Sequence, residues 1–332
     1  MAIATEHHSQ LADVAAAVRG ARRITALCHE NPDADTIGAA IAMGLIAERL
    51  GIEHEIVSVD GIPPMFDYLP LVASVRERPR LEPDLAVVCD AATLERVGRI
   101  ATEEAAWFEG ARLLNVDHHV SSTYYGDLNL VDPTAAATCQ VLLELVDALE
   151  IPLDAPLATA LLTGIVRDSL GFSDRATNGT TLRAAARLVD AGAPLALIHR
   201  TILAELPFPT MALWGKMLAE VGTIADGRVV HTTLTLEMLS ETGTQQHDAD
   251  GVAEFLARAK GADVTLLLRE LGDAETRVSV RTSERVDATR VTAPFGGGGH
   301  RSRAGATVRR HWPEARDEVL AAAAAALEDL QR

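Results

Sequence analysis

The first half of the chain alternates short runs of apolar residues with longer segments in which apolar residues recur every three or four positions. The short runs predict buried β-strands and the longer segments predict amphipathic helices. Strands are predicted at residues 24–28, 55–59, 85–89 and 113–116. Helices are predicted at residues 36–50, 137–149, 157–166 and 180–191. Strands that alternate with helices indicate an α/β fold whose parallel sheet is covered on both faces.

The pattern changes after Ala193-Pro194. Two helices are predicted at residues 195–206 and 211–224, on either side of Pro207-Phe208-Pro209. Further strands are predicted at residues 228–235, 263–269 and 277–282, with helices at 250–259 and 313–331. The sequence therefore predicts a larger N-terminal parallel-sheet domain (1–194), a helical linker (195–225) and a smaller α/β domain (226–332).

Composition narrows the class of ligand. Of the 332 residues, 48% are hydrophobic and 23% charged, as in globular proteins. The formal net charge of -17 argues against tight binding of long duplex nucleic acid, which depends on cationic contacts. Small phosphorylated ligands remain compatible with this charge, because metal ions reverse the local field of an acidic pocket.

The expected compartment is the cytoplasm. Only three cysteines occur, Cys28, Cys89 and Cys139, without a Cys-x-x-Cys pair, which indicates buried thiols in a reducing environment. The N-terminus has no basic region followed by an apolar core, so no signal peptide is expected. No stretch is apolar and long enough for a membrane span, and we expect no membrane partner.

Potential metal ligands follow three predicted strands of the first domain, and one more lies near a helix end. Ligands gather at the carboxyl ends of parallel strands, so these residues are expected to share one site. Carboxylates and imidazoles without thiolates suit manganese, magnesium or iron better than structural zinc. Two ions about 3.5–4 Å apart, bridged by a carboxylate, would support phosphoryl chemistry. The candidate ligands are His29, Asp33, Asp35, Asp90, His118 and Asp168.

Each candidate also has an ordinary structural interpretation. Asp33 and Asp35 precede a predicted helix and are typical N-cap residues. Asp90 alone would more simply be a turn residue, and Asp168 a polar residue at a helix end. The combination of these segments with Asp117-His118-His119 favours the metal site. Since neighbouring side chains diverge, one histidine of the pair would bind metal while the other faces a substrate phosphate.

A glycine run in the second domain, Gly296-Gly297-Gly298-Gly299-His300, is a candidate phosphate or nucleotide site. Consecutive glycines let backbone amides approach an anion and adopt positive φ, although such runs are often only flexible loops. Positive side chains follow the run, which favours the binding interpretation. The candidate contacts are Gly297, Gly298, Gly299, His300, Arg301 and Arg303, joined by Arg281 and Ser283 on a preceding strand.

These motifs, in this order, resemble the DHH phosphoesterases that carry a C-terminal DHH-associated domain, and most closely their stand-alone, NrnA-like members. The resemblance runs from about Arg22 to Val308. The matching segments are residues 29–38, 88–90, 115–119, 128–137, 163–172, 250–270 and 295–305. It implies a catalytic DHH domain, a substrate-binding DHH-associated domain, an active-site cleft between them, and a homodimer.

The resemblance also implies a role for each residue. His29 and Asp33 would hold one ion, Asp35, His118 and Asp168 the other, and Asp90 would bridge them. Asp117 would orient the histidines, and His119 would contact the scissile phosphate. The two divalent ions would be Mn2+, with Mg2+ as the alternative. His300 and the glycines would bind the far end of the substrate, with help from Arg281.

The implied activity is hydrolysis of short oligonucleotides, of 3'-phosphoadenosine 5'-phosphate (pAp), or of both, to nucleoside monophosphates by a metal-bridging hydroxide. The alternative is a phosphodiesterase for cyclic dinucleotides such as c-di-AMP. A family-II-like pyrophosphatase and a nucleotide-binding protein without turnover are further alternatives. The glycine run with its histidine argues against the pyrophosphatase. The complete ligand set argues against a binding protein without turnover.

Two departures from the family pattern concern charge. Arg167-Asp168-Ser169 stands where family members commonly carry threonine on both sides of the late aspartate. Arg301-Ser302-Arg303 follows His300 where the family is richer in small residues. Arg167 would tune metal affinity or point away, and the two extra arginines would favour a more highly charged end group.

Overall fold

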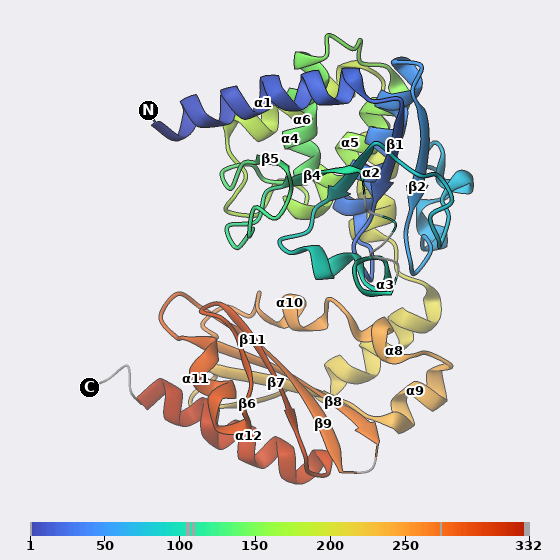
Figure 1. Cartoon of the computed structure of the whole chain (residues 1–332). Helices are drawn as coiled ribbons and strands as arrows, with labels where there is room; N and C mark the ends of the chain where they lie inside the picture. The colour runs from blue at the N-terminus through green and yellow to red at the C-terminus, as the bar shows by residue number, and fades with distance from the viewer. Residues whose placement is uncertain (1, 104–106, 108–109, 273, 329–332) are drawn as a thin grey trace. The chain divides into compact units, whose positions relative to one another are not determined.

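A computed structural model describes residues 2–103, 107, 110–272 and 274–328. The chain forms two compact units, Met1–Glu205 and Leu206–Arg332, which are described separately (Figure 1). The boundary lies inside the segment 195–225 that the sequence assigns to a linker. Among the described residues, no helix combines the length and apolarity that crossing a membrane requires.

The first unit is built on a five-stranded sheet in the order β2-β1-β3-β4-β5, and all neighbouring strands are parallel. This order reverses direction between β1 and β3, and ligands bind at such a switch point in open α/β sheets. The strands are β1 Arg23–Leu27, β2 Glu53–Val57, β3 Leu85–Cys89, β4 Arg112–Asp117 and β5 Leu128–Val131. The first four confirm the predicted strands within two residues. The edge strand β5 was not predicted, because only its last two residues are buried.

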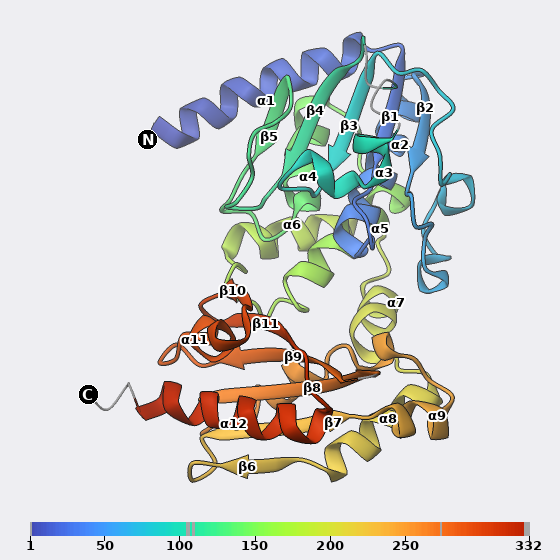
Figure 2. The same cartoon turned by 60° about the horizontal axis from the view of Figure 1, so that its bottom comes forward.

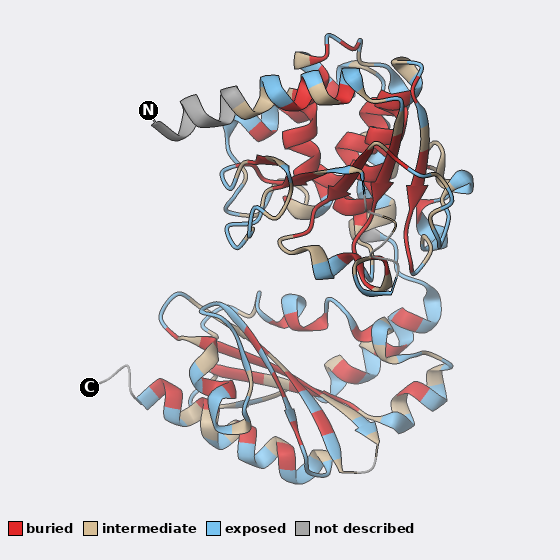
Figure 3. Cartoon of the chain, in the orientation of Figure 1, coloured by how far each residue is buried: buried red, intermediate tan, exposed pale blue. Residues whose placement is uncertain are grey.

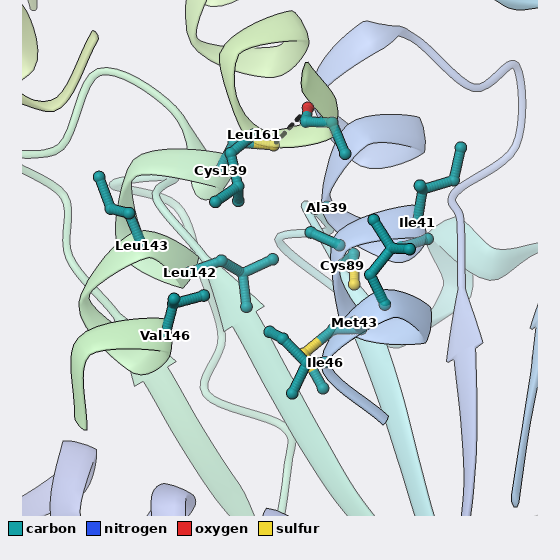
Figure 4. Close-up of a cluster of buried hydrophobic side chains, with 14 of the residues drawn as sticks. Ala39, Ile41, Met43, Ile46, Cys89, Cys139, Leu142, Leu143, Val146 and Leu161 are labelled. Carbon is teal, nitrogen blue, oxygen red and sulfur yellow. Dashed lines mark hydrogen bonds between the residues drawn. The ribbon is translucent and has the colours of Figure 1, made fainter. Parts of the chain in front are cut away.

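Long helices cover one face of this sheet. Alternate strand residues such as Ile24, Val87 and Val116 pack against them in the largest hydrophobic core. Figure 4 shows part of this core, where Met43 and Leu142 lie near two of the buried cysteines, Cys89 and Cys139. The helices of the unit are α1 Ala2–Gly20, α2 Ala34–Arg49, α3 Arg99–Thr102, α4 Thr138–Ala148, α5 Ala155–Asp168, α6 Gly179–Asp190 and α7 Leu195–His199. Helix α1 is an addition to the predicted elements.

The opposite face of the sheet has a thinner cover. Leu27, Val57 and Val88 on that face pack against Val97 and Ile100, which belong to a short 3-10 turn and to α3. Both faces are therefore covered, as predicted, but only one of them by long helices. This 3-10 turn is Leu94–Val97, and the other short turns among the described residues of the unit are the 3-10 segments Pro64–Phe66 and Val72–Ser74 and the π-turn Arg200–Ala204.

The second unit contains a six-stranded mixed sheet in the order β10-β11-β9-β8-β7-β6, in which only β7 and β8 run parallel. Helix α12 runs along one face (Figure 2), where it encloses a core with Val264, Val280 and Val319. Helices α8 to α10 cover part of the other face. The elements are α8 Phe208–Ala219, β6 Gly222–Ile224, β7 Val229–Leu234, α9 Leu236–Thr242, α10 Val252–Leu256, β8 Val264–Gly272, β9 Glu275–Thr282, α11 Ala288–Thr292, β10 Gly298–His300, β11 Arg303–Val308 and α12 Trp312–Glu328.

Three predictions for the chain after residue 194 were wrong. The helix predicted at residues 211–224 ends at Ala219, and Gly222–Ile224 is a strand paired with β7. The intervening Asp226-Gly227 has positive φ at both residues, as a tight hairpin requires. The helix predicted at 195–206 stops at His199 and continues as the π-turn. The glycine run is not wholly a loop, because Gly298–His300 pairs with β11.

Candidate metal centre

The carboxyl ends of the strands bring the predicted ligands together. His29 follows β1 by two residues, Asp90 follows β3 directly, and Asp117 is the last residue of β4. Asp33 and Asp35 lie at the beginning of α2, which starts from the same edge, and Asp168 ends α5. These segments meet at the β1/β3 switch point of the sheet, where its topology favours a ligand site.

Three overlapping groups of side chains have donor atoms within 4.8 Å of one another. All six residues predicted as ligands take part, and His119 is the one addition. Asp90 is shared between two groups, and His118 is also shared. The groups are His29 with Asp33 and Asp90, Asp35 with His118 and Asp168, and Asp90 with His118 and His119.

Asp90 stands between the two histidine-containing halves of the cluster. Its Oδ2 lies 3.7 Å from Nε2 of His29, and its Oδ1 lies 3.6 Å from Nε2 of His118. Asp90 has φ of 63°, a left-handed conformation that aspartate tolerates better than most residues. The hydroxyl of Thr138 donates to Oδ1 over 2.8 Å and fixes the carboxylate. This geometry gives each carboxylate oxygen a different neighbour, as a bridging ligand requires.

Backbone carbonyls orient the two buried imidazoles. Nδ1 of His29 lies 2.8 Å from the carbonyl oxygen of Glu30, and Nδ1 of His118 lies 3.3 Å from that of Ala135. A proton on Nδ1 satisfies these contacts and leaves Nε2 of each ring with a lone pair toward the carboxylates. A hydrogen-bonded second nitrogen is the usual support for a metal-binding histidine.

Asp33 and Asp35, at the beginning of α2, each have a structural contact and also lie in the candidate site. Oδ1 of Asp33 accepts from the amides of Asp35 and Thr36, so Asp33 is the N-cap of α2, and it also lies 3.8 Å from Nε2 of His29. The cap interpretation is therefore confirmed, and the same carboxylate also faces the histidine of the candidate site. The fully buried Asp35 accepts from the amides of Thr138 and Cys139 at the beginning of α4. Burial, together with the charges of Asp90 and Asp168, nevertheless raises the pKa of Asp35 well above its ordinary value.

The carboxylates make both imidazoles strongly basic. Burial alone would lower the pKa of His29, but Asp33 and Asp90 beside it raise that pKa to about 10. Burial also lowers the pKa of His118, and the neighbouring carboxylates, first Asp168 at 3.2 Å, raise it to about 10. The common cause is a concentration of carboxylates in a buried space. Such a site stabilises added positive charge.

Asp117 holds the two histidines that follow it in the chain. Its Oδ1 accepts from the amides of His118 and His119 and from Nδ1 of His119 at 2.7 Å. This contact with Asp117 raises the pKa of His119 and favours its imidazolium form. The side chain of His119 remains 44% exposed. It can therefore present Nε2 as a charged donor while Asp117 holds the ring.

Three residues of the site were absent from the sequence-based candidates. Thr138 positions Asp90 by donating to its carboxylate. The hydroxyl of Thr36 accepts from the amide of His29 and donates to the carbonyl of Cys89, and in this way it connects the ends of β1 and β3. Gly164 lies against Asp35, where a Cβ atom would meet Oδ1 of Asp35 at well under 3.0 Å. Threonines near helix starts and a glycine in a helix are too common to identify such contacts from one sequence.

In the second unit, several predicted contacts have partners of their own. Arg281 donates through Nε to Glu254 over 2.9 Å, and Ser283 donates to the buried Asp263 over 2.8 Å. Cβ atoms at Gly297 and Gly299 would collide with β11, so close packing explains these two glycines. Gly298 has open space around it. The side chains of His300, Arg301 and Arg303 are exposed, and Arg301 also reaches the carbonyl of Glu284.

The donor set in the first unit fits two divalent ions. Each histidine-containing half offers one imidazole and at least two carboxylates, a set suited to Mn2+ or Mg2+. Nε2 of His118 is buried and lies 3.2 Å from Oδ2 of Asp168 and 3.6 Å from Oδ1 of Asp90, but neither contact has hydrogen-bond geometry within the described residues. A buried ring nitrogen that faces carboxylates without such a bond is a suitable ligand atom for a cation.

Mn2+ is expected to raise the Tm of the purified chain, and more so at pH 8.5 than at pH 6.5. The pKa of His29 and His118 near 10 exceeds the unfolded value of about 6.5, so without metal their stabilising contribution is complete below pH 6.5 and lost as pH rises through 10. Mn2+ must displace these protons. At 100 times Kd the expected gain is about 2.7 kcal/mol, or about 5–10 °C. Calorimetry that finds no rise at either pH would contradict the assignment.

Models of two protein families together match most of the chain. The model of the DHH family N-terminal domain matches residues 23–165, and that of the DHHA1 domain matches residues 226–329. A bifunctional oligoribonuclease and PAP phosphatase NrnA of Thermus thermophilus is 30% identical over 302 residues, which cover 90% of this chain and 87% of that protein. The chain belongs to the DHH family. It is a hydrolase of that family, whose phosphoesterases depend on metal ions.

Other proteins share the arrangement of this DHH-family chain. A bifunctional oligoribonuclease and PAP phosphatase NrnA of Bacillus subtilis is 26% identical over 296 residues, which cover 88% of this chain and 91% of that protein. The crystal structure of an exopolyphosphatase-related protein from Bacteroides fragilis has a TM-score of 0.88, with 19% identity and 98% of each chain covered. The latter likeness confirms the mixed α/β fold, with a parallel sheet in the DHH domain and a separate C-terminal sheet.

Proposed function

We propose that this DHH-family hydrolase is a two-metal phosphoesterase that releases nucleoside monophosphates from very short oligonucleotides, from pAp, or from both. The observation that carries the proposal is Asp90, whose two oxygens face the histidines of two separate ligand groups. Similarity to the relatives of Thermus thermophilus and Bacillus subtilis supports this substrate class, because both bear oligoribonuclease and PAP phosphatase in their names. The acidic charge of -17 disfavours long duplexes.

The proposed ligands are His29, Asp33 and Asp90 for one ion, and Asp35, Asp90, His118 and Asp168 for the other. When bound, two such ions, with Mn2+ as the proposed metal, would make water more acidic and stabilise negative charge on a phosphate. The chain contributes the alignment of these ligands through Thr138 and the start of α4. His119, held by Asp117, would donate a charged hydrogen bond to the scissile phosphate.

In the second unit we assign substrate contact chiefly to His300, Arg303 and Arg281. Their side chains carry or can carry positive charge, and His300 and Arg303 are exposed. The open Gly298 and the turn residue Arg301 would add further contacts. The hydroxyl of Ser283 donates to Asp263. We therefore assign Ser283 a supporting role beside the substrate and not a direct contact with it.

Direct assay of the full chain tests this function. The purified protein would be incubated with Mn2+ and, separately, with pAp, pApA, c-di-AMP and inorganic pyrophosphate, and products would be separated by ion-exchange chromatography. We expect AMP from pAp and pApA at higher kcat/KM than from c-di-AMP, and complete loss of activity with EDTA. Preferred hydrolysis of c-di-AMP or of pyrophosphate would replace the proposal with that activity. Tight nucleotide binding without any hydrolysis would indicate a sensor.

A further inference from the structure

Three basic side chains lie in one row across the second sheet. Strand pairing places His300 on β10 opposite Arg303 on β11, and Arg303 opposite Arg281 on β9. Paired residues project from the same face of a sheet. Burial alternates along β9 and β11 (Figure 3), with Val280 and Ala304 buried on the helix-covered face. The row therefore belongs to the opposite, more exposed face of these strands.

The charges in this row are only partly compensated. Like charges directly opposite each other destabilise a pair of strands, and Arg303 faces Arg281. Glu254 of α10 pairs with Arg281. Within the described ranges, neither Arg303 nor His300 has an ion-pair partner. An anionic ligand would relieve the repulsion, so the row is an attractive place for one.

Space for a ligand lies beside the row. The next pairs on the same face join Gly298 to Gly305, and Gly305 to Ser279. A Cβ atom at Gly298 would meet nothing within 4 Å, and one at Gly305 would make only an ordinary contact. The sheet surface next to the three basic residues is therefore almost free of side chains, and an anion can approach the guanidinium groups without obstruction.

We propose that Arg303 is a specificity-determining residue that makes this face select a terminal phosphate monoester. A monoester carries a charge of about −1.5 to −2 at pH 7 and three free oxygens, whereas a phosphodiester carries a single charge. Glu254 forms its ion pair with Arg281, so among the described residues Arg303 is the cation of the row without a close ion pair of its own, and His300 adds a donor. Because a nucleotide end would be the natural carrier of such a group, the inference rests on the proposed function.

Dinucleotides that differ only in the terminal group test this selectivity. For the wild-type chain with Mn2+, kcat/KM should be at least about tenfold higher for pApA than for ApA, the equivalent of about 1.4 kcal/mol. Arg303→Ala should lower that ratio by about tenfold, chiefly by raising KM for pApA, with a smaller loss of kcat/KM for ApA. An unchanged ratio in Arg303→Ala would overturn the proposal.

Arg277→Ala is the matched control. Arg277 lies on the same face of β9, four residues and about 13 Å from Arg281, and opposite Thr307. The control removes the same charge from the same surface but leaves the row intact, so it should preserve the pApA/ApA ratio. If Arg277→Ala lowers the ratio as much as Arg303→Ala, overall charge and not the row is responsible.

Binding without turnover separates this inference from the proposed function. Isothermal titration of the full chain in EDTA with AMP and with adenosine compares ligands with and without the terminal phosphate. The wild-type chain should bind AMP more tightly than adenosine, and Arg303→Ala should lose most of that preference. This result would stand even if neither dinucleotide were hydrolysed, in which case only the proposed function fails. Equal binding of AMP and adenosine by the wild-type chain would refute the selectivity.

Discussion

Asp90→Asn is expected to lower kcat for pAp by about 1000-fold or more. The carboxylate faces both histidine-containing halves of the centre, with its oxygens 3.7 Å and 3.6 Å from the two Nε2 atoms. The neutral amide has only one oxygen and would leave one half short of a ligand. A loss of about 4 kcal/mol of transition-state stabilisation corresponds to this factor.

Folding is not expected to limit this variant. Asparagine adopts the left-handed conformation at φ of 63° as readily as aspartate does, and the loss of one negative charge relieves repulsion with Asp35 and Asp168. Asp132→Asn is the matched control, because Asp132 also directly follows a strand of this sheet but accepts from Thr134 outside the ligand groups. Mn2+-dependent kcat should be unchanged in the control. Activity of Asp90→Asn within tenfold of the wild type would remove Asp90 from the bridging position.

Gly164→Ala is expected to destabilise the first unit although alanine favours helices. Residue 164 lies inside α5, where alanine would contribute about 1 kcal/mol. Its Cβ atom would, however, lie well under 3.0 Å from Oδ1 of Asp35 and from Sγ of Cys139. Overpacking of this kind costs about 1–3 kcal/mol. We expect a lower free energy of unfolding in urea and a Mn2+ affinity reduced by about tenfold or more, since Asp35 must move.

Gly215→Ala, the same substitution at a position with free space, is expected to stabilise the chain. Gly215 lies inside α8, and a Cβ atom there would meet nothing within 4 Å. This variant should be more stable than the wild type by up to about 1 kcal/mol, with unchanged Mn2+ affinity. If both variants were stabilised equally and bound Mn2+ normally, the close contact between α5 and Asp35 would not matter for the centre.

Most of the first unit was predictable because its strands are continuous apolar runs. Residues such as Val87 and Val88 are buried on both faces of the sheet and leave a clear pattern. Elements with a weaker pattern were missed. They include β5 at the edge of the sheet, which is only partly buried, and α1, in which buried and exposed positions are mixed. The hairpin of β6 and β7 was missed because an apolar segment concealed its Asp226-Gly227 turn.

The sequence by itself selected the six residues that we propose as metal ligands, and the fold brings all six into overlapping groups. Carboxylates and imidazoles at strand ends are chemically distinctive, and parallel strands must bring their carboxyl ends to one edge. Only the tertiary structure decided how these ligands are held, through Thr138, Gly164 and the amides that begin α4. It also placed Arg303 between His300 and Arg281. Such contacts depend on strand register and helix approach, which join residues far apart in the chain and leave no local pattern.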